Sequence, residues 1–146
     1  MKTAVVYFTF GGTTKKEAER LAKDLGAVVC RVEEEGSRSS FGVYVRGSYQ
    51  AMRRMASAIK PIKINLTEYD KIIICCPVWA GYPAPAFNAI VRQLPSGKDV
   101  EIILCSASGG TPKSREGTIE LVKKTGCRVT ECKDVLTNVV SKKIKV

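Results

Sequence analysis

Three short segments combine glycine with hydroxyl or aromatic side chains, and each directly follows an apolar run. They are TFGGTT (9–14), CPVWAGYPAP (76–85) and CSASGGTP (105–112). Glycines and hydroxyls between a strand and a helix N-terminus form a nest of backbone N–H donors that can hold an anion. The first segment therefore predicts a phosphate-binding loop to which Thr9, Thr13 and Thr14 add hydroxyl donors.

The first segment matches neither of two common nucleotide-binding motifs. No lysine stands where a Walker A loop requires one, and the glycine spacing is not GxGxxG. An NTPase and a GxGxxG dinucleotide site are therefore disfavoured. By itself, the segment is also an ordinary turn between a strand and a helix.

The second segment contains Trp79, the single tryptophan of the chain, close to Gly81 and Tyr82. A tryptophan in such a loop offers a flat apolar face to a planar ligand. The alternative is an aromatic plug that packs the loop onto its own helix. The residue type alone favours the plug.

Histidine is absent from all 146 residues, and the six cysteines form no CxxC motif. The first fact excludes a Ser-His-Asp triad, a Cys-His pair and a histidine-bearing zinc site. Most of the cysteines lie inside apolar runs, where a free thiol behaves as a small hydrophobic side chain. We expect no metal site.

Apolar periodicity predicts strands and helices in alternation along the chain. The helices are expected at 13–26, 48–59, 84–94 and 113–124, with Thr13 or Thr14 as the first N-cap. Residues 36–50 are predicted to form a loop. Pro61 helps to end the helix 48–59. The strands are expected at 3–10, 27–33, 71–78, 100–108 and 127–136.

The central strands are apolar throughout, which indicates a parallel sheet with helices on both faces. The fold class predicted is α/β, a doubly wound three-layer sandwich with a five-stranded parallel sheet of order 2-1-3-4-5. The three small-residue segments then meet at the carboxyl edge of the sheet. Only 137–146 follow the last strand, so we expect a shortened final helix and an apolar patch that a homodimer would cover.

The chain carries 24 Lys and Arg against 14 Asp and Glu, a net charge of +10, and 36–67 contains no acidic residue. The basic stretch 38–63 suggests an acidic partner, an anionic ligand or nucleic acid or, alternatively, a solvated surface without special purpose. No recognised nucleic-acid motif accompanies it. The sequence shows neither a membrane-spanning run nor the cleavage region of a signal peptide, so we expect no membrane association and a cytoplasmic location.

Taken together, these segments resemble the flavodoxin family. The resemblance covers essentially the whole chain as a single domain over 1–146, and a further segment, FGVYVRGSYQAMRR, is similar to one in small flavodoxin-like proteins. It implies non-covalent FMN binding, with Trp79 stacking on the isoalloxazine ring. The FMN-binding residues that it implies are Thr9, Phe10, Gly11, Gly12, Thr13, Thr14, Pro77, Val78, Trp79, Ala80, Gly81, Ser106, Ala107, Ser108, Gly109 and Gly110.

The resemblance implies an electron carrier between redox partner proteins, with the cofactor supplying the chemistry. One alternative is a small FMN-dependent NAD(P)H:quinone or flavin reductase on the same fold. Another is a module that has kept the fold, lost the flavin and binds a partner.

Overall fold

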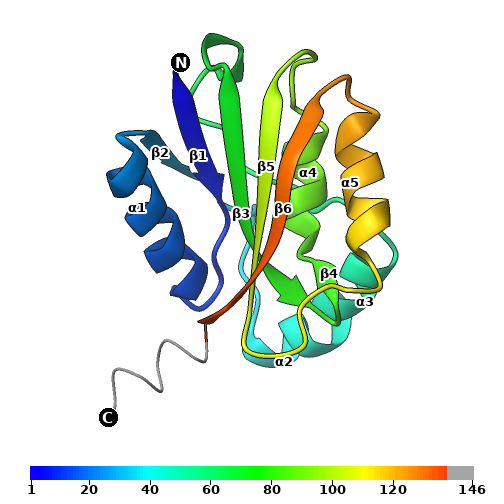
Figure 1. Cartoon of the computed structure of the whole chain (residues 1–146). Coiled ribbons are helices and arrows are strands. Elements are labelled where there is room, and N and C mark those ends of the chain that lie inside the picture. The colour runs from blue at the N-terminus through cyan, green and yellow to red at the C-terminus, as the bar shows by residue number, and fades with distance from the viewer. Residues whose placement is uncertain (138–146) are drawn as a thin grey trace.

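The computed structural model describes residues 1–137, and its centre is a twisted parallel sheet (Figure 1). The five parallel strands stand in the order β2-β1-β3-β5-β6. A two-residue strand, β4 (Tyr82–Pro83), pairs antiparallel with the end of β3. Apart from β4, the predicted order is confirmed. The strands are β1 (Thr3–Tyr7), β2 (Val28–Arg31), β3 (Lys71–Trp79), β5 (Asp99–Ser106) and β6 (Arg128–Leu136).

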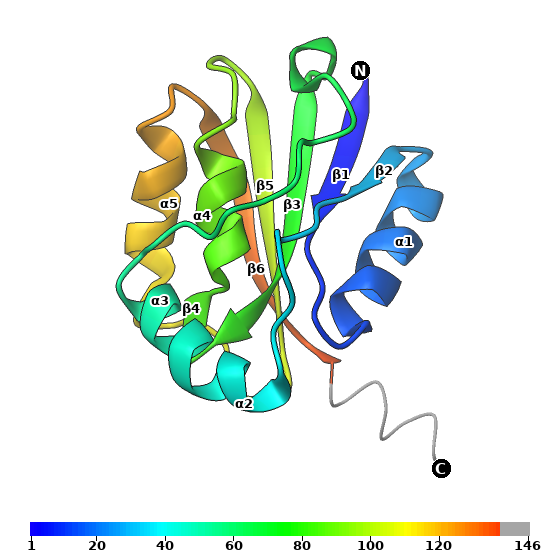
Figure 2. The ribbon, with the colours of Figure 1, turned by 180° about the vertical axis from the view of Figure 1, so that it is seen from behind.

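Helices cover both faces of the sheet, as the sequence predicts. Helix α1 (Thr13–Leu25) lies on one face, and α4 (Pro85–Val91) and α5 (Arg115–Lys123) lie side by side on the other (Figure 2). A 3-10 turn, η2 (Leu66–Glu68), precedes β3. The predicted final helix lies outside the described residues.

Strand β3 forms the centre of the core, because both of its faces are buried. Ile72, Ile74 and Cys76 belong to the larger hydrophobic cluster, whereas Ile73 and Cys75 belong to the cluster that includes Ala18 and Ala22 of α1. All five of these β3 residues are fully inaccessible to solvent. This burial explains why the strand is a continuous apolar run.

All six cysteines are free and buried, which confirms their interpretation as small hydrophobic side chains. Within residues 1–137, no cluster of cysteine and acidic side chains could hold a metal ion. Nor does any helix of this part combine the length and apolar character needed to cross a bilayer.

The prediction of a loop over 36–50 holds for 36–39 and is wrong from residue 40 onward. Residues 40–52 are helical throughout, as α2 (Ser40–Gly42), the π-helical η1 (Val43–Gly47) and α3 (Ser48–Met52). The predicted helix 48–59 is too long, because α3 ends at Met52 and Arg54 has a left-handed φ of 55°. Gly47 permits close packing within this helical segment, because a Cβ there would lie 2.9 Å from the Trp79 ring.

Smaller corrections concern the first loop. Strand β1 ends at Tyr7 rather than at residue 10. The N-cap of α1 is Gly12, in the left-handed region, rather than Thr13 or Thr14. Thr13 and Thr14 are instead the first two residues of the helix itself.

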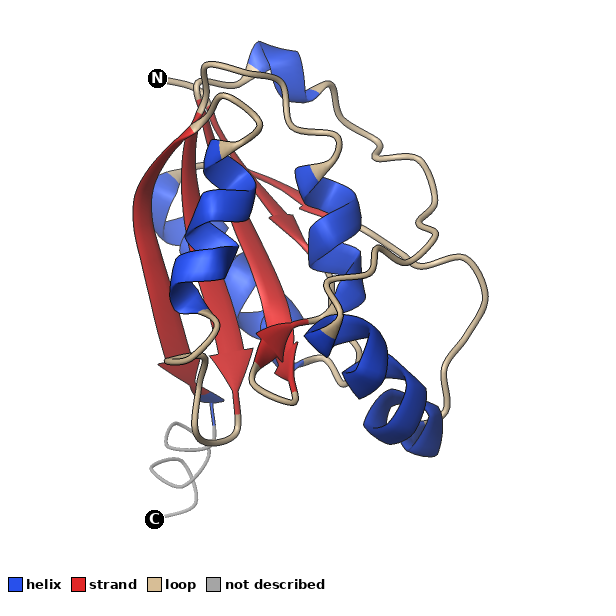
Figure 3. Cartoon of the chain, turned by 90° about the vertical axis from the view of Figure 1, so that its right-hand side faces the viewer, coloured by secondary structure: helices blue, strands red, loops and turns tan. Residues whose placement is uncertain are grey.

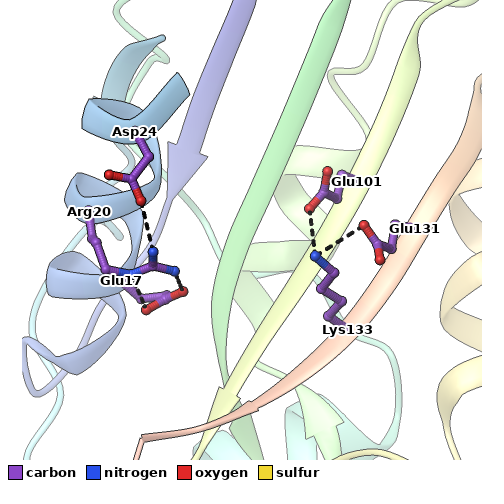
Figure 4. Close-up of polar contacts among 6 residues, drawn as sticks. All are labelled: Glu17, Arg20, Asp24, Glu101, Glu131 and Lys133. Carbon is purple, nitrogen blue, oxygen red and sulfur yellow. Dashed lines mark hydrogen bonds and ion pairs between the residues drawn. The ribbon is translucent and has the colours of Figure 1, made fainter. Parts of the chain in front are cut away.

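The sequence predicts an apolar patch on part of one sheet face, and the amino-terminal half of the face that carries α1 bears ion pairs. Glu101 of β5, only 6% exposed, pairs with Lys71 at 3.0 Å and with Lys133 at 3.9 Å. Lys133 also pairs with Glu131 at 3.2 Å (Figure 4). A buried carboxylate is stable only with such partners, so this half of the face is polar.

The buried thiols predict a loss of stability at alkaline pH. Burial raises the pKa of Cys75 and Cys76 well above the ordinary value and that of Cys105 to about 11. Above a pH of about 8.5, thiols of the unfolded chain ionise while these stay protonated. The unfolded state then binds fewer protons, so the free energy of unfolding falls as pH rises, by up to about 1.4 kcal/mol per pH unit for each thiol.

Urea unfolding in reducing buffer between about pH 7 and about pH 10 measures this slope. Cys105→Ala should reduce the slope of the free energy of unfolding against pH by about the contribution of one thiol. A free energy of unfolding that does not change over this range would contradict the prediction.

Candidate functional site

The loop after β1 presents backbone N–H groups at the start of α1. The Thr9 hydroxyl accepts a hydrogen bond from the Gly12 N–H at 3.0 Å, and the Lys16 N–H makes the first helical bond, to the Gly12 carbonyl. The first N–H groups of a helix have no intrahelical acceptor, and the helix dipole favours an anion beside them. The first turn contains no acidic residue. The loop is therefore built to receive negative charge.

A pocket of about 190 Å³, here the loop pocket, opens between this loop and the ends of β3 and β5. Five of its lining side chains carry hydroxyls, and none of those that the structure describes is ionisable apart from one cysteine. The lining residues are Thr9, Phe10, Gly11, Thr13, Thr14, Pro77, Val78, Cys105, Ser106, Ala107 and Thr137.

Ser106 carries the strongest sign that the loop pocket takes a polar ligand. Its hydroxyl oxygen is buried and has no hydrogen-bond partner among the described residues. Leaving a buried hydroxyl unsatisfied costs about 1–3 kcal/mol. The Thr137 hydroxyl donates to the Ser106 carbonyl at 3.2 Å, so the residue directly after β6 also contributes to this rim.

Cys105 lies on the same wall as Ser106. Burial raises the pKa of its thiol to about 11, although a hydrogen bond with the Thr14 hydroxyl opposes the rise. The thiol therefore stays protonated at neutral pH and adds no negative charge to the loop pocket.

Trp79 is packed rather than open, since only 7% of its surface is exposed. Phe8 and Phe10 meet the ring edge-to-face at centroid distances of 6.0 and 6.2 Å. The Arg38 guanidinium lies 5.3 Å from the ring centroid, and Gly47 of η1 packs against the ring. The plug interpretation therefore describes Trp79 in part, and the partners of the ring include residues from the β1 loop and from 38–47.

A second, more apolar pocket of about 540 Å³, here the Trp79 pocket, adjoins the loop pocket through Val78, which lines both. Its other walls come from Trp79 and Ala80, at the end of β3, and from the helical segment 40–52. The lining residues are Ser40, Val43, Ser48, Val78, Trp79 and Ala80.

Ala80 and Gly81 form the two-residue turn of the β3–β4 hairpin. Trp79 pairs with Tyr82 across it, and both central residues have positive φ, 55° for Ala80 and 81° for Gly81. This is the pattern of a type I′ turn, which suits Asn-Gly and strains alanine at the first position. The Gly81 carbonyl accepts a hydrogen bond from the Ser114 hydroxyl at 2.6 Å, which ties the turn to the start of α5.

The predicted site residues do not all meet in one place. Of the third segment, Ser106 and Ala107 line the loop pocket, whereas Ser108, Gly109 and Gly110 line neither pocket. The Asp134 carboxylate holds the far end of this segment by accepting from the N–H and the hydroxyl of Thr111. Gly12 and Gly81 shape their loops without lining either pocket.

Five lining residues were not predicted from the sequence. Cys105 and Thr137 sit at the carboxyl ends of β5 and β6, where the position of a strand end is the available signal. Ser40, Val43 and Ser48 belong to the segment predicted to be a loop, and nothing in their types distinguishes them.

Much of the basic stretch 38–63 is engaged inside the molecule. Arg38 donates to both carboxylate oxygens of Glu34, at 2.8 and 3.1 Å. Arg54 bonds the Thr118 hydroxyl and the Ser114 carbonyl. The basic stretch is therefore not a uniformly free cationic face.

No protein-family model matches the sequence, and no curated protein matches it. Solved structures do. A flavoprotein in complex with FMN from Lactobacillus acidophilus NCFM has a TM-score of 0.78 at 23% identity, covering 96% of this chain and 97% of its own. A candidate flavoprotein from Bacteroides uniformis ATCC 8492 has a TM-score of 0.78 at 20% identity, covering 99% and 98%.

The two-electron reduced flavodoxin of Megasphaera elsdenii has a TM-score of 0.54 at 16% identity, covering 92% of this chain and 86% of its own. The chain has the flavodoxin-like fold. In flavodoxin-like and other doubly wound sheets, ligands bind at the carboxyl ends of the strands where strand order reverses. Here that point lies between β1 and β3, at the loop pocket.

The strained turn predicts that Ala80→Asn stabilises the protein. Asparagine tolerates the left-handed region, so the free energy of unfolding should rise by about 1 kcal/mol. Gly81→Ala should lower it by about 1 kcal/mol, because it places a second Cβ at positive φ. Urea unfolding of the two variants measures both changes, and a destabilised Ala80→Asn protein would disprove the assigned turn.

Proposed function

We propose that this protein binds FMN non-covalently across the loop pocket and the Trp79 pocket, and that it carries electrons between redox proteins. The observation that carries the proposal is the pairing of the two pockets. A hydroxyl-lined pocket without acidic side chains at the N-terminus of α1 suits a phosphate, and it adjoins an apolar pocket beside Trp79 that suits a planar ring.

The residues present fit FMN. The orphaned Ser106 hydroxyl lacks the partner that a polar ligand would supply. Thr13 and Thr14, with the first N–H groups of α1, would hold the phosphate. Val78 lines both pockets and would lie beside the junction between the phosphate end and the ring end.

On this proposal, FMN supplies the electron-transfer chemistry and the protein supplies position and surroundings. Trp79 and Val43 would exclude water from one side of the ring site. The neutral lining of the loop pocket would avoid repulsion of the phosphate. The flavoprotein of Lactobacillus acidophilus, a structure in complex with FMN, supports the proposal by analogy of fold.

The proposal predicts that FMN binds the apo-protein more tightly than riboflavin does, because riboflavin lacks the phosphate. Fluorescence of Trp79, the single tryptophan, should be quenched on binding. Thr13→Val and Ser106→Ala should each weaken FMN binding by about 1.5–3 kcal/mol, the range for hydrogen bonds to charged groups. Both should change riboflavin affinity less if their contacts are with the phosphate.

Thr130→Val is the matched control, since Thr130 lies on β6 and lines neither pocket. Equal affinity for FMN and riboflavin would argue against a phosphate site. If FMN neither binds nor quenches, the flavin-free module is favoured. Oxidation of NADPH by the FMN-loaded protein alone would favour the reductase.

A further inference from the structure

The outer face of the helical segment 40–52 is apolar and open to solvent. Phe41, Val45, Tyr49 and Met52 are 76%, 52%, 53% and 48% exposed. Their spacing of four, four and three residues places them in one stripe along a helix. Met55, 44% exposed, follows the end of α3. We call these five residues the outer stripe. Figure 3 shows the segment projecting from the body of the protein.

The inner face of this segment is already used for packing. Ala51 is fully buried, Gly47 lies against the Trp79 ring, and Val43 packs on the main hydrophobic cluster. The outer stripe is therefore not needed to hold the helix in place. Contiguous exposed apolar surface on a small protein marks an interaction site.

Cations flank the outer stripe. Arg46 and Arg53 lie within or beside it, and neither forms an ion pair with a carboxylate among residues 1–137. The Arg53 guanidinium lies 6.0 Å from the Tyr49 ring centroid. The sequence from 36 to 67 contains no acidic residue. An apolar stripe with uncompensated guanidinium groups calls for an acidic rim on whatever covers it.

The composition favours a protein as the occupant. Aromatic side chains, methionine and arginine are enriched at protein interfaces, whereas lysine is depleted, and the outer stripe and its two cations are of these types. A membrane-surface helix instead carries a strongly charged polar face rich in lysine and arginine, whereas Arg46 is the single charged residue of 40–52. A second copy of this chain would bring the same cations together, because a twofold interface repeats one patch.

We propose that the outer stripe, with Arg46 and Arg53, docks a protein that presents acidic side chains around an apolar patch. Ser40, Val43 and Ser48 of the same segment line the Trp79 pocket. A docked partner would thus lie about one helix diameter, 10–12 Å, from that pocket. The redox role of the partner rests on the proposed function, whereas the docking surface does not.

The test measures binding of an acidic [2Fe–2S] ferredoxin, used as the probe, to the apo-protein and to the FMN-treated protein by calorimetry. Wild type should bind it more weakly as salt is added. Two double variants should each weaken binding about tenfold. One combines Val45→Ser with Tyr49→Ser, and the other combines Arg46→Glu with Arg53→Glu. Exposed positions tolerate such changes with little effect on stability, and urea unfolding verifies this.

Matched controls lie elsewhere on the surface. Val28→Ser with Val29→Ser removes exposed apolar side chains from β2, and Lys124→Glu reverses an exposed charge after α5. Both should bind the ferredoxin as wild type does. Binding by the apo-protein separates this proposal from FMN loading: loss of FMN binding with retained docking would overturn only the proposed function.

Three outcomes would overturn the docking proposal. The first is a failure of the expected ferredoxin binding: either the wild type does not bind it, or the variant with Val45→Ser and Tyr49→Ser (the serine variant) binds it like wild type. The second is a dimer in sedimentation that the serine variant abolishes, which would assign the outer stripe to a second copy. The third is stronger binding to vesicles of equimolar phosphatidylcholine and phosphatidylserine, lost in the same variant, which would assign it to a lipid surface.

Discussion

Burial of β3 on both faces is the constraint on which the rest of the structure depends. Its side chains alternate between two hydrophobic clusters, one under α1 and one under α4 and α5. A strand in this position must have parallel neighbours and helical cover on each side. Its carboxyl end therefore falls where the loops after β1 and β5 begin, and the loop pocket forms at that point. The loop pocket therefore follows from the position of β3 between two parallel neighbours.

The packing of Trp79 connects this core to the outer surface. The ring is held by Phe8, Phe10 and Gly47, so the helical segment 40–52 has a fixed position over the end of β3. Arg38 adds to this arrangement through its paired hydrogen bonds to Glu34. Trp79, for which the family resemblance implies stacking on a flavin ring, thus also anchors a helix whose outer face stays open.

Buried polar groups of this protein differ in whether other residues of the chain satisfy their hydrogen bonds or charges. Glu101 is buried but paired with two lysines, and Asp134 satisfies both donors of Thr111. Three buried side-chain oxygens have no partner among the described residues, those of Ser57, Asn88 and Ser106. Ser106 is the one of the three that lines the loop pocket, and since unsatisfied buried groups are costly, its hydroxyl is the group there that a polar ligand would satisfy.

The sequence by itself determined the fold class, the strand order and most residues of the loop pocket. Apolar runs and glycine-rich loops report directly on burial and on strand ends, and both are local signals. Only the tertiary structure decided that Trp79 is packed, that 40–52 is helical despite two glycines, and that Ser108 to Gly110 lie away from the pockets. These outcomes depend on contacts between residues distant in sequence, such as Gly47 with Trp79 and Asp134 with Thr111. No local pattern encodes such contacts, because the packing partner overrides the intrinsic preference of each segment.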